Sequence, residues 1–477
     1  MKRKIFVTFL ALALVVSLAL PSFAGKVKRP HPSKLKYPPL KMKTPEVVEL
    51  SFDNGLSGFF IEDHEIPVVN VVLLVKTYFP EKEKYGLNEM AAWVMRNGGS
   101  KNWPADKLND ELEFLAAYLE VSGYDLYTYI SMNCLKKDLD KVLGILADLV
   151  MNPAFPPDKV EMKRQTMLED IRRRNDQPMK IARREITKLI YGDHPYGWYE
   201  STSSVEAITR DDLIAFHSKY FHPNNTLIGI SGDVTKDEIE GAISKVFADW
   251  KPADVEIPPV PPIEKAPKPG YYYAYKDINQ AYMMLGHLGI NANNPDRCAV
   301  NIMNFILGGG SFTSWITQEV RSDRGLAYSA GSMFSSDAFA KGRFIAYAQT
   351  KAESYAMALQ VMKEQIERMR NEGPSPEEVR KAIDSYLNSK VFDYESKAQV
   401  VGRLIRLRFE GRPLDTPERD LDIYSKLTVD DIKRVARKYL HPDSLVVLIV
   451  GDEKQFGRPL SDFGEVHRIE LEEEDDW

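Results

Sequence analysis

A long internal repeat is the feature that most restricts the fold of this 477-residue chain. The segment "ITRDDLIAFHSKYFHPNNTLIGISGDV" begins at Ile208 and matches "LTVDDIKRVARKYLHPDSLVVLIVGDE", which begins at Leu427. The identical positions are separated by 219 residues throughout, and they include Thr209/Thr428, Asp212/Asp431, Lys219/Lys438, Tyr220/Tyr439, His222/His441, Pro223/Pro442, Gly232/Gly451 and Asp233/Asp452. A constant offset over so many identities indicates a duplicated domain.

Both copies predict the same local structure. Thr209 and Thr428 are expected to cap a helix that has acidic residues in its first turn. A His-Pro pair ends the helix, and a β-branched strand then runs to Gly-Asp. Elsewhere, strand pairs such as "LEVSGYDLYTYISMNC" alternate with amphipathic helices. We therefore predict an α+β fold class, with two homologous α/β domains that each contain a mostly antiparallel sheet flanked by helices.

Composition divides the chain into six segments. The segment 251–270, "KPADVEIPPVPPIEKAPKPG", has seven prolines in twenty residues and is expected to be a semi-rigid linker. It separates a first domain at 46–250 from a second at 271–462. Residues 25–45 are rich in Lys and Pro and are expected to form a flexible or loosely docked arm, and residues 463–477 are an acidic tail that we expect to be solvated.

The first 24 residues are typical of a secretory signal peptide. Basic residues precede an apolar run, and Ser22-Phe23-Ala24 offers small residues at a cleavage site. We therefore expect an exported protein, located in the periplasm, with no membrane span after cleavage. The alternative is an uncleaved anchor, because the run from Ile5 to Leu20 approaches the length of a span.

Net charge and cysteine content exclude few further classes of protein function. The net charge of −6 argues against a nucleic-acid partner. The only cysteines, Cys134 and Cys298, could form a disulfide or remain buried thiols, and two cysteines do not define a metal site.

Several motifs occur in an order that is similar to the insulinase/pitrilysin metallopeptidases, which include the processing peptidases. They are "GLNEMAAWVMRNGGS", "DLDKVLGILADLVMNPAF", "HPYG" at 194–197 and "LGGGSFTSWITQEVRSDRGLAYS", together with the duplication and its proline linker. The resemblance covers nearly the whole chain after residue 24. It implies two homologous halves that close like a clamshell on an extended peptide.

Active members of that family carry H-x-x-E-H on the first helix, where both histidines bind one zinc ion and the glutamate activates its water. The equivalent positions here are Glu89, Ala92 and Trp93, and Glu169 stands where a distal ligand would. Ala92 and Trp93 cannot bind zinc, and His217 and His222 have ordinary interpretations at a helix end. We predict that this chain binds no catalytic metal or other cofactor.

The second half keeps an Arg and a Tyr seven residues apart, Arg321 and Tyr328. The resemblance implies that Arg321 hydrogen-bonds a substrate carbonyl and that Tyr328 donates to the oxyanion. It also implies that the glycine loop Gly308, Gly309, Gly310 and Ser311 contacts substrate. Arg324 is the rival for the arginine role, and both Arg321 and Tyr328 could instead serve only to build the fold.

These features lead to one hypothesis and two alternatives. The chain is expected to be the non-zinc subunit of a heterodimeric metalloendopeptidase, inactive alone. Its partner is a homologous subunit with H-x-x-E-H and Zn²⁺, and its ligands are extended peptides. The first alternative is an inert peptide-binding or scaffold protein of the same fold, and the second is an autonomous zinc peptidase with rearranged ligands.

Overall fold

The first half of the chain builds a six-stranded mixed sheet. This computed structural model describes residues 45–471, and the predicted signal peptide and nearly all of the Lys/Pro arm lie outside that range. The strand order is β1-β2-β6-β3-β5-β4, and only the β2–β6 pair is parallel. The strands are β1 (Val48–Ser51), β2 (Ser57–Glu62), β3 (Val68–Lys76), β4 (Tyr118–Gly123), β5 (Tyr127–Leu135) and β6 (Thr226–Gly232).

The second half repeats this sheet. Its order is β10-β12-β8-β13-β7-β14, and the β13–β7 and β14–β7 pairs are parallel. The strands are β7 (Gly270–Tyr275), β8 (Gln280–Leu288), β10 (Ala327–Phe334), β12 (Arg343–Lys351), β13 (Val446–Gly451) and β14 (Val466–Ile469), while β9 (Ile290–Asn291) and β11 (Ser336–Asp337) form a separate pair. Apart from the outermost β1 and β14, the strands correspond one to one in chain order. The predicted α+β class with mostly antiparallel sheets is confirmed.

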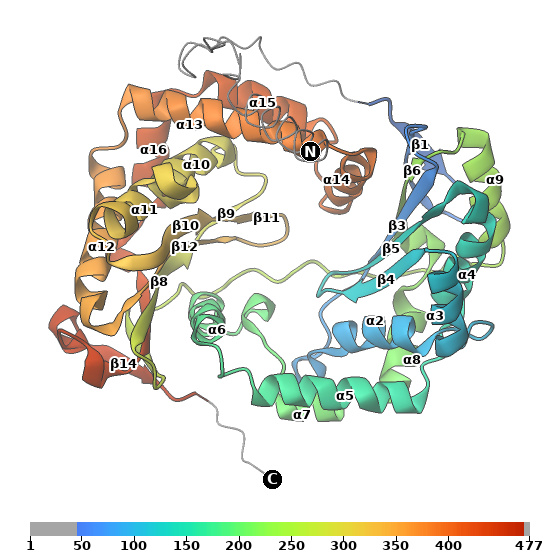
Figure 1. Ribbon diagram of the computed structural model, residues 1–477, viewed down its shortest axis with the longest axis horizontal. Helices are drawn as coiled ribbons and strands as arrows, with labels where there is room; N and C mark the ends of the chain where they lie inside the picture. Colours follow the sequence, from blue (N-terminus) through green and yellow to red (C-terminus); the bar gives the residue numbers. More distant parts are fainter. Residues whose placement is uncertain (1–44, 472–477) are drawn as a thin grey trace, which may run out of the picture. The chain divides into compact units, whose positions relative to one another are not determined.

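Helices pack against both sheets (Figure 1). In the first half they are α2 (Leu87–Gly98), α3 (Ala105–Phe114), α4 (Leu139–Met151), α5 (Pro157–Arg172), α6 (Pro178–Tyr191), α7 (Thr202–Ala207), α8 (Arg210–Tyr220) and α9 (Lys236–Val246). In the second half they are α10 (Arg297–Asn304), α11 (Trp315–Thr317), α12 (Tyr355–Asn371), α13 (Pro376–Ser389), α14 (Lys397–Phe409), α15 (Thr416–Lys426) and α16 (Val429–Tyr439).

The repeated helices α8 and α16 begin at the predicted caps. The side chain of Thr209 accepts a hydrogen bond from the backbone N–H of Asp212, and the Asp212 carboxylate accepts one from the backbone N–H of Thr209 at 2.8 Å. Thr428 and Asp431 make the same reciprocal pair. Each cap satisfies backbone donors that the first helical turn leaves open, so the repeat fixes the start of both helices.

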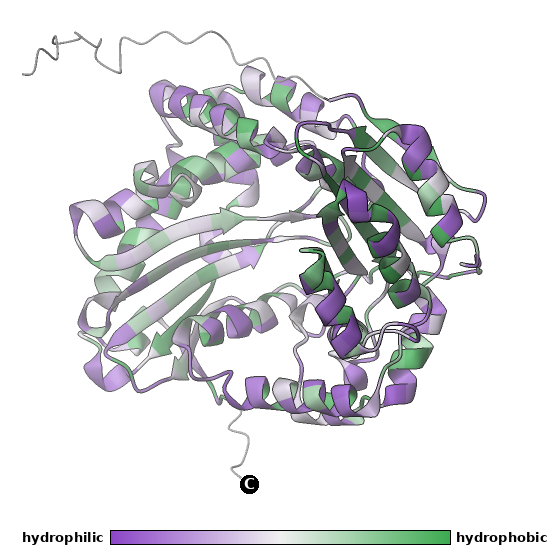
Figure 2. Cartoon of the chain, turned by 45° about the vertical axis from the view of Figure 1, so that its right-hand side comes forward, coloured by the Kyte–Doolittle hydropathy of each residue, from purple (hydrophilic) through white to green (hydrophobic). Residues whose placement is uncertain are grey.

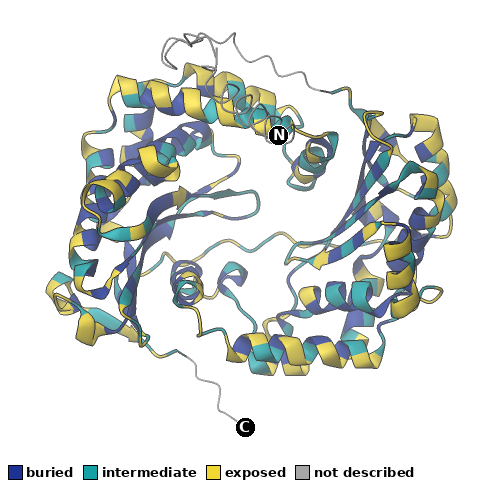
Figure 3. Cartoon of the chain, viewed as in Figure 1, coloured by how far each residue is buried: buried dark blue, intermediate teal, exposed yellow. Residues whose placement is uncertain are grey.

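Two separate apolar cores lie beneath these helices. Buried residues follow the strands and the inner faces of the helices, whereas α5 exposes much of one side (Figure 3). Green apolar residues are concentrated on the strands of the first sheet (Figure 2). Cys134 lies in the first core and Cys298 in the second, and both are free, buried thiols.

Two helices cover the sheet of the opposite half. From the first half, α6 places Ile181, Ile186 and Ile190 against β8 and β13 of the second sheet. From the second half, α14 places Val401 and Ile405 against β2 and β6 of the first sheet. This reciprocal burial of apolar surface links the two halves, and residues 45–471 belong to one compact unit.

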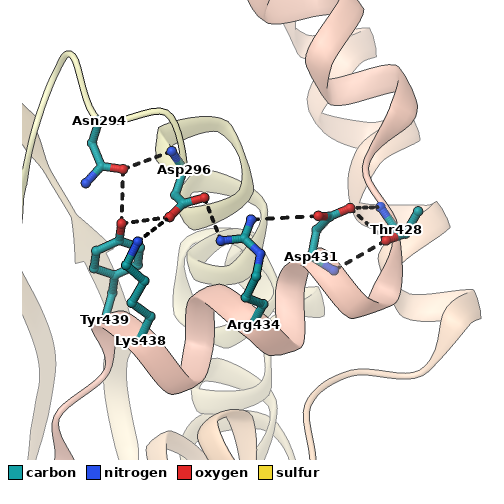
Figure 4. A network of polar contacts seen from close by, with 7 residues as sticks. All are labelled: Asn294, Asp296, Thr428, Asp431, Arg434, Lys438 and Tyr439. Atoms are coloured by element: carbon teal, nitrogen blue, oxygen red, sulfur yellow. Dashed lines mark hydrogen bonds and ion pairs between the residues drawn. The ribbon is translucent and has the colours of Figure 1, made fainter.

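A buried carboxylate anchors α16 to the start of α10. Asp296 accepts hydrogen bonds from Arg434 at 2.7 Å, Lys438 at 3.0 Å and the Tyr439 hydroxyl at 2.7 Å (Figure 4). Burial favours the neutral acid, but these three donors outweigh it and hold the pKa of Asp296 at about 2. The charged Asp296 side chain therefore links α10 and α16 by hydrogen bonds and ion pairs.

The ends and the linker complete the chain. Residues 251–269 contain no helix or strand. The second half extends further than predicted, because β14 lies inside the range assigned to the acidic tail and pairs with β7. Over the described residues, none of the helices combines enough length and apolar character to cross a bilayer.

Candidate functional site

The face of α2 that corresponds to H-x-x-E-H is linked to α5 by an ion pair between Glu89 and Lys163. Ala92 is buried and Trp93 is half-buried. The ammonium of Lys163, on α5, donates to the Glu89 carboxylate at 2.6 Å and lies 6.0 Å from the centre of the Trp93 ring. The Lys163 side chain is 7% exposed and that of Glu89 is 50% exposed. The contact thus joins α5 to α2 through a nearly buried cation.

This set of side chains does not fit a zinc ion. Glu89 offers one carboxylate, whereas the methyl group of Ala92 and the indole of Trp93 offer no ligand. The Lys163 ammonium next to Glu89 would also repel a second cation. No group of three or more His, Cys, Asp or Glu side chains within residues 45–471 is arranged to hold a metal.

Glu169 does not complete such a site. Its carboxylate pairs with Arg172 one turn further along α5. The neighbouring Asp170, together with Glu89 and Glu200, lines a cavity of about 300 Å³ beside α5. Burial raises the pKa of Glu200, and the nearby Glu89 carboxylate adds to that shift. Asp170, and not Glu169, is the carboxylate of α5 that lines this cavity, and sequence reasoning did not single it out.

The two histidines near the end of α8 are structural. His217 lies 2.8 Å from the backbone carbonyl of Val150, and its burial lowers its pKa to about 4. The ring nitrogens of His222 lie within hydrogen-bonding distance of the Lys251 and Ser218 carbonyls. Both interpretations agree with those given from the sequence.

The glycine loop follows α10 through a π-helical segment, η6 (Phe305–Gly309). Gly308 is buried against β10, where a side-chain carbon would come within 2.4 Å of the Ser332 backbone nitrogen. Gly309 and Ser311 are exposed, and Gly310 is half-buried. Gly308 therefore serves close packing, and contact with a peptide stays a prediction for the other three residues.

The structure brings Arg321 and Tyr328 together. Arg321 lies in a second π-helical segment, η8 (Gln318–Asp323), and Tyr328 lies at the start of β10, on the edge of the second sheet. The guanidinium carbon of Arg321 is 5.6 Å from the centre of the Tyr328 ring. Tyr328 is 78% exposed, and its hydroxyl has no hydrogen-bond partner in the described part of the chain. A large exposed phenol of this kind is available to bind a ligand.

The rival arginine is engaged elsewhere. Arg324 pairs with Glu319 at 3.5 Å, whereas Arg321 contacts aromatic rings and no carboxylate among the described residues. Arg321 thus keeps its N–H donors for a ligand. The second ring that it contacts is Phe312, which sequence reasoning missed, although it directly follows the glycine loop.

A larger cavity, of about 820 Å³, lies between residues of the two halves. Tyrosines from β5 and nearby loops line it, α14 contributes Arg403 and Arg406, and Glu410 directly follows that helix. Burial raises the pKa of Asp125, which lies in this lining and accepts a hydrogen bond from Tyr85 at 2.9 Å. This lining of hydroxyls, rings and both charge signs suits a polar, extended ligand.

Comparisons with known proteins agree with this arrangement. Residues 68–198 match the family model described as Insulinase (Peptidase family M16), and residues 207–386 match the one described as Peptidase M16 inactive domain. A Rickettsia bellii protein described as an uncharacterized zinc protease is 24% identical over 412 residues, which cover 84% of this chain and 97% of that protein. The non-peptidase homolog YmxG of Helicobacter pylori is 25% identical over 404 residues, or 83% of this chain and 91% of that protein.

Solved structures share the fold. A peptidase M16 inactive domain from Pseudomonas fluorescens superposes with a TM-score of 0.77 at 27% identity, over 85% of this chain and 98% of that chain. The periplasmic protease PqqL of Escherichia coli matches with a TM-score of 0.73 at 15% identity, over 92% of this chain and 50% of that chain. With both sheets, both family models and the degenerate α2 motif in agreement, the chain belongs to peptidase family M16, the insulinase family, as a member of the inactive type.

Proposed function

We propose that this chain is the non-zinc subunit of an exported, heterodimeric M16 endopeptidase. Its substrate is an extended peptide, and a homologous subunit with an intact H-x-x-E-H motif supplies the metal chemistry. The observation that carries the proposal is the pair of donors on the half-buried Arg321 and the exposed Tyr328, neither of which is paired with a carboxylate among the described residues, in a chain whose own α2 face holds Glu89 and Lys163 instead of a zinc site.

Arg321 would bind the peptide and Tyr328 would act on the reacting carbonyl. A guanidinium has five N–H donors in one plane, which suits it to hold backbone carbonyl groups in a fixed position. A phenolic O–H directed at the carbonyl oxygen stabilises the negative charge that develops there, and one such donor contributes about 10²- to 10³-fold in rate. The Tyr328 hydroxyl is free to do so because no described side chain occupies it.

Two further observations support parts of the proposal. The cavity of about 820 Å³ offers room for a peptide segment, and its tyrosines and charged groups can bind backbone amides. The signal-like residues 1–24 support export to the periplasm, and the structural relative PqqL is itself described as periplasmic.

The test is reconstitution with a homologue that carries an intact H-x-x-E-H motif, to be sought in the same genome. This chain alone should cleave no peptide, and adding it to the homologue should raise the cleavage rate. Arg321→Ala or Tyr328→Phe should remove most of that gain, while Arg324→Ala should remove little. Sequencing the mature protein from the periplasmic fraction tests export, and the expected N-terminus is Gly25.

The second candidate is an inert scaffold or peptide-binding protein. One observation favours it, which is the similarity to YmxG, described as a non-peptidase homolog. The same reconstitution separates the two functions. A scaffold would bind peptides or partners with unchanged affinity after Tyr328→Phe and would accelerate no cleavage.

A further inference from the structure

An exposed aromatic residue lies against the arginine of the candidate site. The ring centre of Phe312 is 4.7 Å from the guanidinium carbon of Arg321, which is closer than the 5.6 Å to Tyr328. We propose that Phe312 is a positioning residue, which holds Arg321 in the orientation that its substrate contact needs. This inference rests on the proposed function and adds a third residue to the site.

The contact orients Arg321 without using its hydrogen-bond donors. A cation is attracted to the face of an aromatic ring within about 6 Å, and both rings satisfy that distance. The N–H groups of a guanidinium point outward in its plane and do not take part in such a contact. A carboxylate partner would compete with a ligand for those donors, as Glu319 does at the Nε of Arg324. The ring contact therefore leaves Arg321 both held in place and able to donate.

The loop that carries Phe312 is held in a defined conformation that leaves the Phe312 ring exposed. Ser311 has a φ of 55°, an uncommon conformation for a residue with a side chain, and Gly308 packs closely against β10. The Ser314 hydroxyl donates to the Ser311 carbonyl at 2.7 Å. Thr317 then ties the following turn to β10 by donating to the Ala330 carbonyl at 2.9 Å. These contacts fix the loop on the strand that begins with Tyr328.

The exposure of Phe312 indicates that its role is not core packing. The residue is 60% exposed, although a phenylalanine on a folded loop would gain free energy by turning inward. Phe114, at the end of α3, is 84% exposed and has no cation over its ring among the described residues. It therefore serves as a matched control for removing an exposed aromatic ring.

The functional experiment compares full-length variants in the peptidase reconstituted with its zinc-carrying homologue. Phe312→Leu removes the ring but keeps an apolar side chain, and it should lower kcat/KM by about threefold to tenfold, the size of a cation–π contact. Phe312→Tyr should restore the activity, and Phe114→Leu should leave it unchanged. In an Arg321→Ala background, Phe312→Leu should have no further effect. An equal loss in both backgrounds would overturn the proposal, as would a Phe312→Tyr variant as impaired as Phe312→Leu.

A spectroscopic experiment on this chain alone separates failure of the inference from failure of the proposed function. In a chain labelled with ¹⁵N-arginine, the Nε–Hε resonance of Arg321 is assigned by its loss in Arg321→Lys. Phe312→Leu should shift that resonance, because the ring current disappears, and Phe114→Leu should not. An unchanged Arg321 resonance would refute the contact. If the resonance shifts while reconstitution gives no activity, the contact exists and its catalytic use is refuted.

Discussion

The ammonium of Lys163 lies 2.6 Å from the carboxylate of Glu89, so a protein cation joins α5 to α2 at the positions that correspond to H-x-x-E-H. In the resembling active peptidases a zinc ion occupies these positions. Here the cross-link between the helices is an ion pair, with Trp93 beside it. The polar link between the two helices therefore requires no metal ion.

This ion pair predicts unequal effects of removing its two partners. Glu89→Ala leaves a nearly buried ammonium without its carboxylate and should lower the free energy of unfolding by about 2 kcal/mol. Lys163→Met leaves a half-exposed carboxylate that water can solvate, and should cost less than about 1 kcal/mol. Urea denaturation of both variants measures the difference.

The exposed pair Glu377–Lys381, at 2.7 Å on α13, provides the control. Glu377→Ala and Lys381→Met should each change stability by less than about 0.5 kcal/mol, because both side chains are solvated. A Glu89→Ala variant as stable as these controls would contradict the role assigned to the contact.

Zinc binding should be absent from the wild-type α2 face. After dialysis against zinc and then buffer, elemental analysis should find far less than one zinc per chain. Installing Glu89→His, Ala92→Glu and Trp93→His should raise zinc retention only when Lys163→Met is added, since the ammonium repels the metal. Stoichiometric zinc in the wild-type chain would refute this interpretation of the site.

The Asp296 network predicts a stability loss in acid. Its folded pKa of about 2 lies below the ordinary aspartate pKa of 3.8, so the unfolded chain binds the proton more readily. The contribution, about 2 kcal/mol, is therefore complete above pH 4 and is lost as the pH falls from 4 to 2. Denaturation at several pH values should show this slope, and Asp296→Asn should reduce it while lowering stability at neutral pH.

A side chain at Gly308 should lower the stability of the protein. Gly308→Ala places a carbon within 2.4 Å of the Ser332 backbone, so the glycine loop or β10 must shift, at a cost of about 1–3 kcal/mol. Gly144→Ala, on α4, meets nothing within 4 Å and should stabilise by up to about 1 kcal/mol. Thermal denaturation compares the two, and equal effects would show that the loop does not depend on close packing.

The sequence predicted those parts of the fold that depend on local signals. The threonine caps of α8 and α16, the His-Pro helix ends and the two-fold repeat follow from short-range chemistry and an exact offset. The crossing of α6 and α14 onto the opposite sheets was not predicted, because their apolar faces do not specify which sheet they cover. β14 was missed since its short strand lies close to an acidic run.

The candidate site was predicted in part for similar reasons. Arg321, in the π-helical segment η8, and Tyr328, at the start of β10, lie together as their seven-residue spacing predicted. The contacts of Lys163 with Glu89 and of Phe312 with Arg321 depend on how distant or adjoining segments pack in the folded chain, so residue spacing does not predict them. Phe312 could have been noticed as an aromatic residue that follows three glycines and a serine in a solvent-exposed loop.

The most direct test of the central claim is the rate at which the zinc-carrying homologue cleaves a peptide, with this chain added as wild type or as Tyr328→Phe. The account predicts no cleavage by this chain alone, a clear gain on adding the wild type, and a gain about 10²- to 10³-fold smaller with the variant. Equal rates with the wild type and Tyr328→Phe, or cleavage by the isolated chain, would contradict it.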